Sequence, residues 1–193
     1  PLSLAEAVSC TLQVAEALAH AASCDVVHRD VKPSNVLITP EGRVKLIDMG
    51  LARFKRVDPS EADLTASGVT LGTFDYISPE QARDPRSADV RSDIYSLGCT
   101  FFYMLAGRPP FPEGTVLQKL LQHQGDQPPD VRQFRPELPE AVALVLRKML
   151  AKDPRDRYAH PTELLAELMG LAEQVGLRPI GWGGKVLVPP QTA

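Results

Sequence analysis

The chain has 193 residues, 44% of them hydrophobic and 23% charged, with a formal net charge of -3. This length is sufficient for a buried core, and the composition excludes a collagenous or intrinsically disordered chain. The slightly acidic balance excludes an overall basic surface for nucleic acid or an anionic membrane. Three cysteines without a CxxC pair disfavour a disulfide framework and a zinc site. We therefore expect a reducing, cytoplasmic compartment and cysteines that serve as small core residues.

The start of the sequence carries no targeting signal. It opens with Pro1 rather than methionine and shows no signal-peptide pattern, so we expect a processed chain or a piece of a longer one. The longest apolar stretch, 99–106, is too short to cross about 30 Å of hydrocarbon. We expect no membrane segment within these residues, and any membrane anchor would lie outside them.

The first predicted elements are a helix and a hairpin. Ser3 and Glu6 have the spacing of a capping box, and apolar residues then recur at helical spacing, which predicts an amphipathic helix over 3–23. Two β-rich runs follow at 36–39 and 44–48. The short turn between them contains glycine, so we expect a hairpin.

The rest of the chain is predicted to be mostly helical. Residues 49–80 lack a sustained period and are expected to form a long loop of the kind that serves as a functional lid or is disordered. A buried helix over 91–106 ends at Gly107, and further helices are predicted at 115–124, 139–150 and 161–173. The tail 176–193, which includes Trp182, is typical of a linker or frayed end. The expected fold is mainly α with one small hairpin.

Side chains suited to phosphate chemistry flank the predicted hairpin. Asp48 offers a carboxylate and Asn35 an amide oxygen, both of which are ligands that Mg²⁺ accepts alongside phosphate oxygens. Asp30 is placed to orient a hydroxyl group or receive its proton, and Lys32 can neutralise charge on a transferring phosphoryl group. The pattern indicates a site for a polyphosphate with metal ions.

These motifs resemble the eukaryotic-like protein kinase family, whose members catalyse phosphoryl transfer. The run His28-Arg29-Asp30, followed by Asn35, resembles the catalytic loop. Asp48-Met49-Gly50 is similar to the metal-binding DFG element with Met in place of Phe, and Ser78-Pro79-Glu80 is similar to the APE element with Ser in place of Ala. Lys32 favours the Ser/Thr branch, and the run 76–81 is similar to bacterial members.

The resemblance implies roles for further residues. Gly72 and Thr73 fall where the family carries its substrate-binding loop, and Asp93 matches an aspartate that accepts backbone amides of the catalytic loop. Arg157 matches the arginine that pairs with the APE glutamate, here Glu80. ATP, Mg²⁺ and a protein with a Ser or Thr hydroxyl are the implied cofactors and substrate. Nucleic acid is not an expected partner, and the N-terminal lobe is expected as a missing partner in cis.

Several of these residues also have simpler interpretations. His28 is interpreted as a core histidine rather than a catalyst, and Asp93 as a structural residue that could equally cap its helix. Arg29 could pair with a phosphate group that is added to the loop. The candidate phosphorylation sites are Thr65, Ser67 and Thr70. Ordinary polar loop residues explain those three hydroxyls equally well.

The sequence lacks other parts that the family requires. Only 27 residues precede His28, and they include neither a glycine-rich loop nor a strand lysine. We therefore expect residues 1–175 to form the C-terminal lobe of a kinase domain, with the N-terminal lobe absent from this chain and 176–193 as a tail. The leading hypothesis is a Ser/Thr protein kinase fragment that transfers the ATP γ-phosphoryl group when complete and shows little activity alone. The alternative is a non-catalytic pseudokinase remnant or protein-interaction module.

Overall fold

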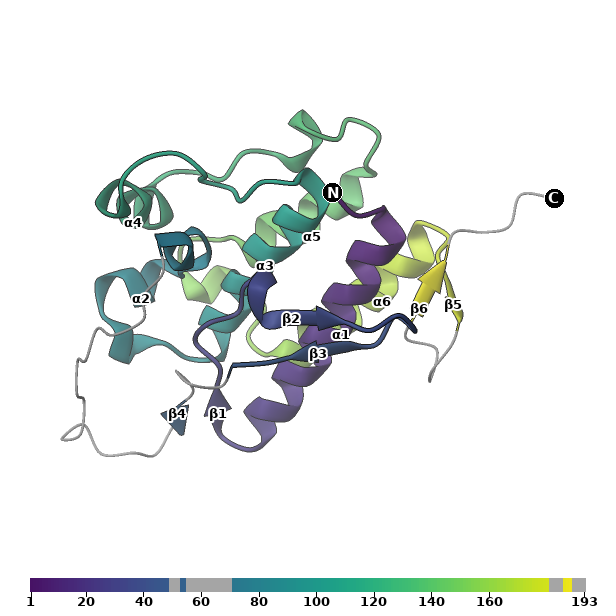
Figure 1. Ribbon diagram of the computed structural model, residues 1–193, viewed down its shortest axis with the longest axis horizontal. Coiled ribbons are helices and arrows are strands. Elements are labelled where there is room, and N and C mark those ends of the chain that lie inside the picture. Colours follow the sequence, from purple (N-terminus) through teal and green to yellow (C-terminus); the bar gives the residue numbers. More distant parts are fainter. Residues whose placement is uncertain (49–52, 55–70, 181–185, 189–193) are drawn as a thin grey trace.

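Six α-helices dominate the described part of the fold. The computed structural model describes residues 1–48, 53–54, 71–180 and 186–188 (Figure 1). The helices are α1 (Leu4–Ser23), α2 (Pro79–Arg83), α3 (Val90–Ala106), α4 (Val116–Gly125), α5 (Glu140–Met149) and α6 (Pro161–Gln174). Within the described residues, short 3-10 helices join them, namely η1 (Pro33–Asn35), η4 (Leu71–Tyr76), η5 (Pro85–Ser87), η6 (Val131–Gln133) and η7 (Pro154–Asp156). The mainly helical class predicted from the sequence is confirmed.

Local sequence signals set the helix boundaries. At the start of α1, Ser3 Oγ accepts the amide of Glu6 while the Glu6 carboxylate accepts the amide of Ser3, so the predicted capping box is present. At the end of α3, Gly107 adopts the left-handed conformation with φ of 75°, which glycine reaches without steric cost. The other predicted helices agree with α4, α5 and α6 to within one or two residues.

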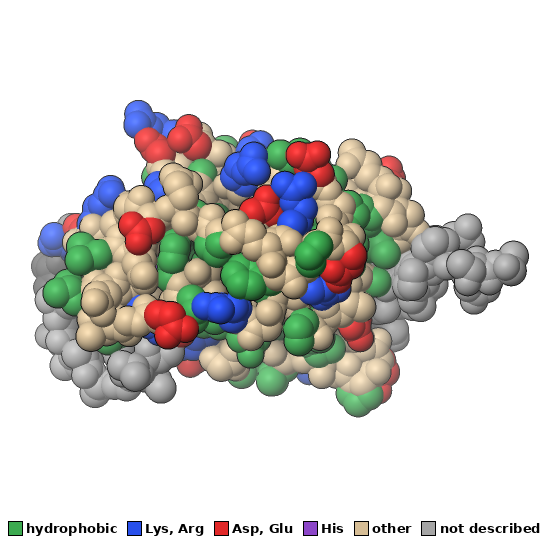
Figure 2. Space-filling model, turned by 90° about the horizontal axis from the view of Figure 1, so that it is seen from above, with side chains coloured by type: hydrophobic (Ala, Val, Ile, Leu, Met, Phe, Trp, Pro, Cys, Tyr) green, Lys and Arg blue, Asp and Glu red, His purple; other side chains and the backbone are tan. Residues whose placement is uncertain are grey.

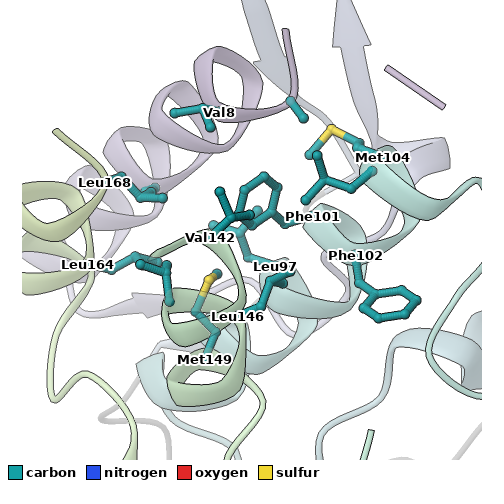
Figure 3. Close-up of a cluster of buried hydrophobic side chains, with 14 of the residues drawn as sticks. Val8, Leu97, Phe101, Phe102, Met104, Val142, Leu146, Met149, Leu164 and Leu168 are labelled. Carbon is teal, nitrogen blue, oxygen red and sulfur yellow. The ribbon is translucent and has the colours of Figure 1, made fainter. Parts of the chain in front are cut away.

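The hydrophobic core surrounds α3. This helix is buried over almost its whole length and packs against α1, α5 and α6. Figure 3 shows Leu97 and Phe101 of α3 among side chains of α1, α5 and α6, including Val8, Val142 and Leu168. Cys10 and Cys99 are buried in this core as expected, but Cys24 is exposed, so the expectation that all three cysteines are core residues is wrong at that position.

Three short antiparallel pairs of strands complete the fold. The predicted hairpin is present as β2 (Val36–Ile38) and β3 (Val44–Leu46), with Val36 opposite Leu46. It is attached to α1 through Gln13, whose side chain donates to the Gly42 carbonyl and accepts the Val44 amide, both at 2.9 Å. This attachment fixes the hairpin across α1, as Figure 1 shows.

The other two pairs differ from the sequence prediction. β1 (Val26–Val27) pairs with β4 (Arg53–Phe54), and β5 (Arg178–Ile180) pairs with β6 (Val186–Val188). The expectation of a linker or frayed end after residue 176 is therefore wrong for the segments that form β5 and β6. The expectation of an uninterrupted loop over 49–80 is also wrong, since β4, η4 and the start of α2 lie within it.

The surface carries charges of both signs. Lys and Arg side chains alternate with Asp and Glu side chains on the face in Figure 2, so that face presents no single-sign patch. Among the described helices, none combines the length and the apolar character that crossing a membrane requires.

Candidate active site

A buried carboxylate organises the loop that carries the candidate catalytic residues. Asp93, in the first turn of α3, accepts the backbone amides of His28 and Arg29 at 2.8 and 2.7 Å. Asp89 caps α3, so the alternative interpretation of Asp93 as the helix cap is wrong. Burial raises the pKa of Asp93 to about 7, although the two amide hydrogen bonds act in the opposite direction. Asp93 thus ties the loop to the most deeply buried helix.

His28 is a core residue, as its simpler interpretation predicts. Its side chain is fully buried, its Nδ1 accepts the amide of Asp30 at 3.3 Å, and its Nε2 lies 3.2 Å from the carbonyl oxygen of Ile47. Because Nδ1 accepts a hydrogen bond, the proton belongs on Nε2, which donates to Ile47. Burial lowers the pKa of His28 and so favours this neutral form. The imidazole joins the loop to the segment after β3.

Asp30, Lys32 and Asn35 form one hydrogen-bonded group. The Lys32 ammonium lies 2.7 Å from Asp30 Oδ2. The Asn35 amide donates both to Asp30 Oδ2 at 3.0 Å and to the Asp30 backbone carbonyl at 2.8 Å. Asp30 and Asn35 are buried, and Lys32 is partly exposed. The Lys32 and Asn35 side chains both contact Asp30 Oδ2.

Asp48 lies beside this group because of the hairpin register. Val36 pairs with Leu46, and the Ile47 amide donates to the Asn35 carbonyl at 2.9 Å, so Asp48 follows directly after the residue paired with Asn35. Asp48 is exposed and has a left-handed φ of 63°. Since the Asn35 amide nitrogen is engaged by Asp30, its carbonyl oxygen is the atom left for a cation. One carboxylate and one amide oxygen fit Mg²⁺, which takes few protein ligands and keeps the others for water and phosphate.

The donor set does not resemble a site for a softer metal. Among the residues that the structure describes, no three His, Cys, Asp or Glu side chains gather in a metal-binding group. The Asp48 carboxylate and the Asn35 amide supply only oxygen ligands, which suit Mg²⁺ better than a softer metal.

The candidate substrate loop is linked to the same group. Gly72 and Thr73 lie in η4, which leads to the Ser78 cap of α2. Gln81 of α2 donates to the Arg29 carbonyl at 3.0 Å. Gln81 was missed in the sequence analysis because it adjoins the APE-like run and only the fold reveals its contact with the loop.

The predicted pairing of Glu80 with Arg157 is confirmed. The guanidinium donates to both carboxylate oxygens, at 2.7 and 2.9 Å, and Ser92 Oγ donates to the same carboxylate at 2.6 Å. Burial alone would raise the pKa of Glu80, but the hydrogen bonds and charge of Arg157 and the bond from Ser92 lower it overall. The side chain of Arg157 is fully buried, so this bidentate pair joins α2 firmly to the segment after α5.

Some predicted positions lie outside the described residues. They are Met49, Gly50, Thr65, Ser67, Thr70 and Trp182. Arg29, which is predicted to pair with a phosphate group on the loop, lies within the described residues and has a left-handed φ of 70°.

Comparison with known proteins identifies relatives of the whole arrangement. The family model described as "Protein kinase domain" matches residues 1–168. The chain is 36% identical over 172 residues to the probable serine/threonine-protein kinase CE0033 of Corynebacterium efficiens, covering 87% of this chain and 26% of the relative.

Two further relatives show the same pattern. Identity is 36% over 168 residues to the serine/threonine-protein kinase PrkC of Bacillus subtilis, covering 87% of this chain and 25% of that protein. It is 35% over 169 residues to the serine/threonine-protein kinase PknB of Mycobacterium tuberculosis, covering 88% and 26%. The chain thus spans about a quarter of the length of the curated relatives it matches.

Proposed function

The chain belongs to the protein kinase family, and on that premise we propose that it carries the hydroxyl-positioning and metal-binding half of a Ser/Thr protein kinase active site. The observation that carries the proposal is the group formed by Asp30, Lys32 and Asn35, held to α3 by Asp93. The relatives are bacterial Ser/Thr kinases by name, which supports a bacterial member of that branch.

The proposed reaction moves one phosphoryl group. The oxygen of a Ser or Thr hydroxyl on a protein substrate attacks the γ-phosphorus of ATP, the bond from that phosphorus to the β-γ bridging oxygen breaks, and ADP leaves. Asp30 orients the hydroxyl and takes its proton, and Lys32 stabilises negative charge on the transferring group. Asn35 and Asp48 would hold Mg²⁺, which when bound would neutralise negative charge on the phosphate groups. A lone hydroxyl is a weak nucleophile, so its placement by Asp30 is the central contribution of this chain.

We assign residues 1–175 to the C-terminal lobe of a kinase domain and 176–193 to a C-terminal segment that follows it and includes the β5–β6 pair. The sequence has no glycine-rich loop or strand lysine to hold the nucleotide. The hairpin beside the site also leaves large apolar side chains uncovered, with Leu37 and Ile38 of β2 50% and 52% exposed and Ile47 39% exposed. Neighbouring apolar side chains exposed together are typical of a surface that another part covers. An N-terminal lobe in cis is the partner that this surface fits.

A regulatory step is also proposed for the segment between Asp48 and Gly72. A phosphate on Thr65, Ser67 or Thr70 would add about -1.5 to -2 charge and could pair with Arg29. Mass spectrometry of the active protein should then find one of these residues phosphorylated. Full activity with all three unmodified would contradict this step.

The competing function is a non-catalytic interaction module. It is disfavoured because Asp30, Lys32, Asn35 and Asp48 are all retained and the first three contact one another. A binding module has no chemical need for that group, whereas phosphoryl transfer needs each member.

Substitution of Asp30 in the full protein tests the proposed function. Transfer of labelled phosphate from Mg-ATP to a general protein substrate should fall by about 100-fold or more in Asp30→Asn, because the substrate hydroxyl loses its base and orienting group. Asp156→Asn is the matched control, since Asp156 is exposed and far along the chain. Equal rates for the Asp30 variant and the unaltered protein would contradict the proposal.

A further inference from the structure

A second buried polar cluster lies at the end of α4, away from Asp30. Its members are Tyr95 of α3, His123 of α4 and Lys152. The Tyr95 hydroxyl lies 2.9 Å from His123 Nδ1, and the Lys152 ammonium donates to that hydroxyl at 3.3 Å. Tyr95 and His123 are fully buried. Lys152 is partly exposed. Burial of polar groups is costly unless they form hydrogen bonds, so the bonds within this cluster restrict its side chains.

Lys152 ties the end of α4 to the core. Its ammonium donates to the carbonyls of Gln122 and His123 in the last turn of α4, at 3.3 and 2.9 Å. The Gln122 carbonyl also accepts the amide of Asp126 at 2.9 Å. The ammonium also lies 4.8 Å from the ring centre of Phe111. A cation at this end of a helix is favourable for the helix dipole as well. Lys152 therefore joins the end of α4 to Tyr95 of α3.

Helix α4 in turn holds η4. Lys119, on α4, lies 2.5 Å from the carboxylate of Asp75 in η4, and both side chains are largely buried, at 12% and 16% exposed. The backbone of Phe74 and Asp75 also lies near the His123 ring, where it partly offsets the lowering of the His123 pKa by burial. His123 Nε2 has no hydrogen-bond partner in the described part of the chain, so this backbone lies near the ring without forming a hydrogen bond to Nε2.

Tyr95 connects this support with the one at Glu80. The guanidinium carbon of Arg157, which pairs with Glu80, lies 4.8 Å from the centre of the Tyr95 ring. Tyr95 thus contacts Arg157 of the Glu80 ion pair through its ring, and His123 of α4 through its hydroxyl.

We propose that Tyr95, His123 and Lys152 are positioning residues for the protein substrate. They fix α4, so that Lys119 holds Asp75 and η4 keeps the conformation that the substrate meets. The role in substrate binding rests on the proposed function, whereas the coupling from the cluster to η4 does not.

Hydrogen–deuterium exchange in the full protein tests the coupling. Tyr95→Phe keeps the ring and removes only the hydroxyl, and should raise amide exchange in residues 71–77 by about three- to tenfold, the factor expected for one lost hydrogen bond. Lys152→Met should do the same and Lys152→Arg should restore slow exchange. Tyr158→Phe and Lys148→Met are matched controls, because Lys148 also lies over a tyrosine ring, that of Tyr158 at 4.2 Å. Unchanged exchange at 71–77, or equal acceleration throughout the chain or by the control variants, would overturn the proposal.

Steady-state kinetics separate the positioning role from simple loss of structure. Tyr95→Phe should raise KM for the protein substrate by about fivefold and leave KM for ATP and kcat within about twofold, since the loss affects substrate binding alone. A fall in kcat with unchanged KM would overturn the substrate role. If the unaltered protein transfers no phosphate, the proposed function fails, while the exchange result still decides the coupling.

Discussion

Arg29 and Asp48 both have left-handed backbone conformations, with φ of 70° and 63°. Such a conformation costs a non-glycine residue roughly 1–2 kcal/mol and persists where surrounding contacts enforce it. At Arg29 the enforcing contact is visible, because Asp93 accepts the Arg29 amide from within α3. Strain of this kind gathers at functional sites, and here it lies on both sides of Asp30 and Asn35.

Arg157 gives a direct test of the pair that anchors α2. Arg157→Met should lower the free energy of unfolding by roughly 3–5 kcal/mol, because it leaves the Glu80 carboxylate buried without its partner. Chemical denaturation measures the change. Arg155→Met is the control, since Arg155 forms an ion pair with Asp153 but its side chain is 83% exposed, and its loss should cost at most about 1 kcal/mol. Equal losses in both variants would contradict the importance of the buried pair.

The pH dependence of stability should reveal the buried His123. Burial lowers the pKa of His123 to about 3, below its ordinary value of 6.5. Between pH 6.5 and 3 the unfolded chain therefore binds a proton that the folded chain does not, and stability falls with decreasing pH by about 1.4 kcal/mol per pH unit from this group. Denaturant titrations from pH 7 to 4 should show that slope reduced in His123→Gln. An unchanged slope would show that His123 protonates in the folded state.

At the scale of the elements, the close contact between α3 and the end of α5 depends on Gly98, which has no side chain. A Cβ atom at Gly98 would lie 2.9 Å from Met149 Cβ and 3.0 Å from Leu150 Cδ2, closer than ordinary packing allows. Glycine weakens an isolated helix, but here it lets the end of α5 approach the middle of α3. Met149 and Leu150 can therefore pack directly against α3 in the core that contains Leu97 and Phe101.

Paired glycine substitutions test this contact. Gly98→Ala should destabilise the fold by about 1–3 kcal/mol, because the core is overpacked. Gly170→Ala in α6 should instead stabilise it by up to about 1 kcal/mol, since a Cβ there meets nothing within 4 Å and alanine favours the helix. Thermal unfolding of the two variants measures both signs. A stabilising effect of Gly98→Ala would contradict the close approach.

The elements also show which features a sequence can reveal. The capping box of α1, the glycine after α3 and the hairpin turn are local signals, so those elements were predicted to within a few residues. The pairing of β1 with β4 joins two-residue strands far apart in sequence, which carry no periodic pattern. The Asp75–Lys119 pair was missed for the same reason, because each residue alone is an ordinary surface charge. In contrast, Asp30 and Asn35 were predictable, since their spacing recurs in a known family.

At the scale of the whole molecule, the candidate site joins the hairpin to the helical body. Asp93 of α3 holds the candidate catalytic loop, and Gln81 connects that loop to α2. On the hairpin, Leu37 and Ile38 remain half exposed. The described residues therefore place the groups that position a hydroxyl and a cation, and they offer an apolar surface for the part that would hold the nucleotide.

Phosphoryl transfer by residues 1–193 alone, compared with the full-length protein, tests this half-site account most directly. With Mg-ATP and a general protein substrate, the full-length protein should transfer phosphate in a reaction that Asp30→Asn abolishes, and residues 1–193 should remain near background because nothing clamps the nucleotide. Robust turnover by residues 1–193 that Asp30→Asn abolishes would contradict the account.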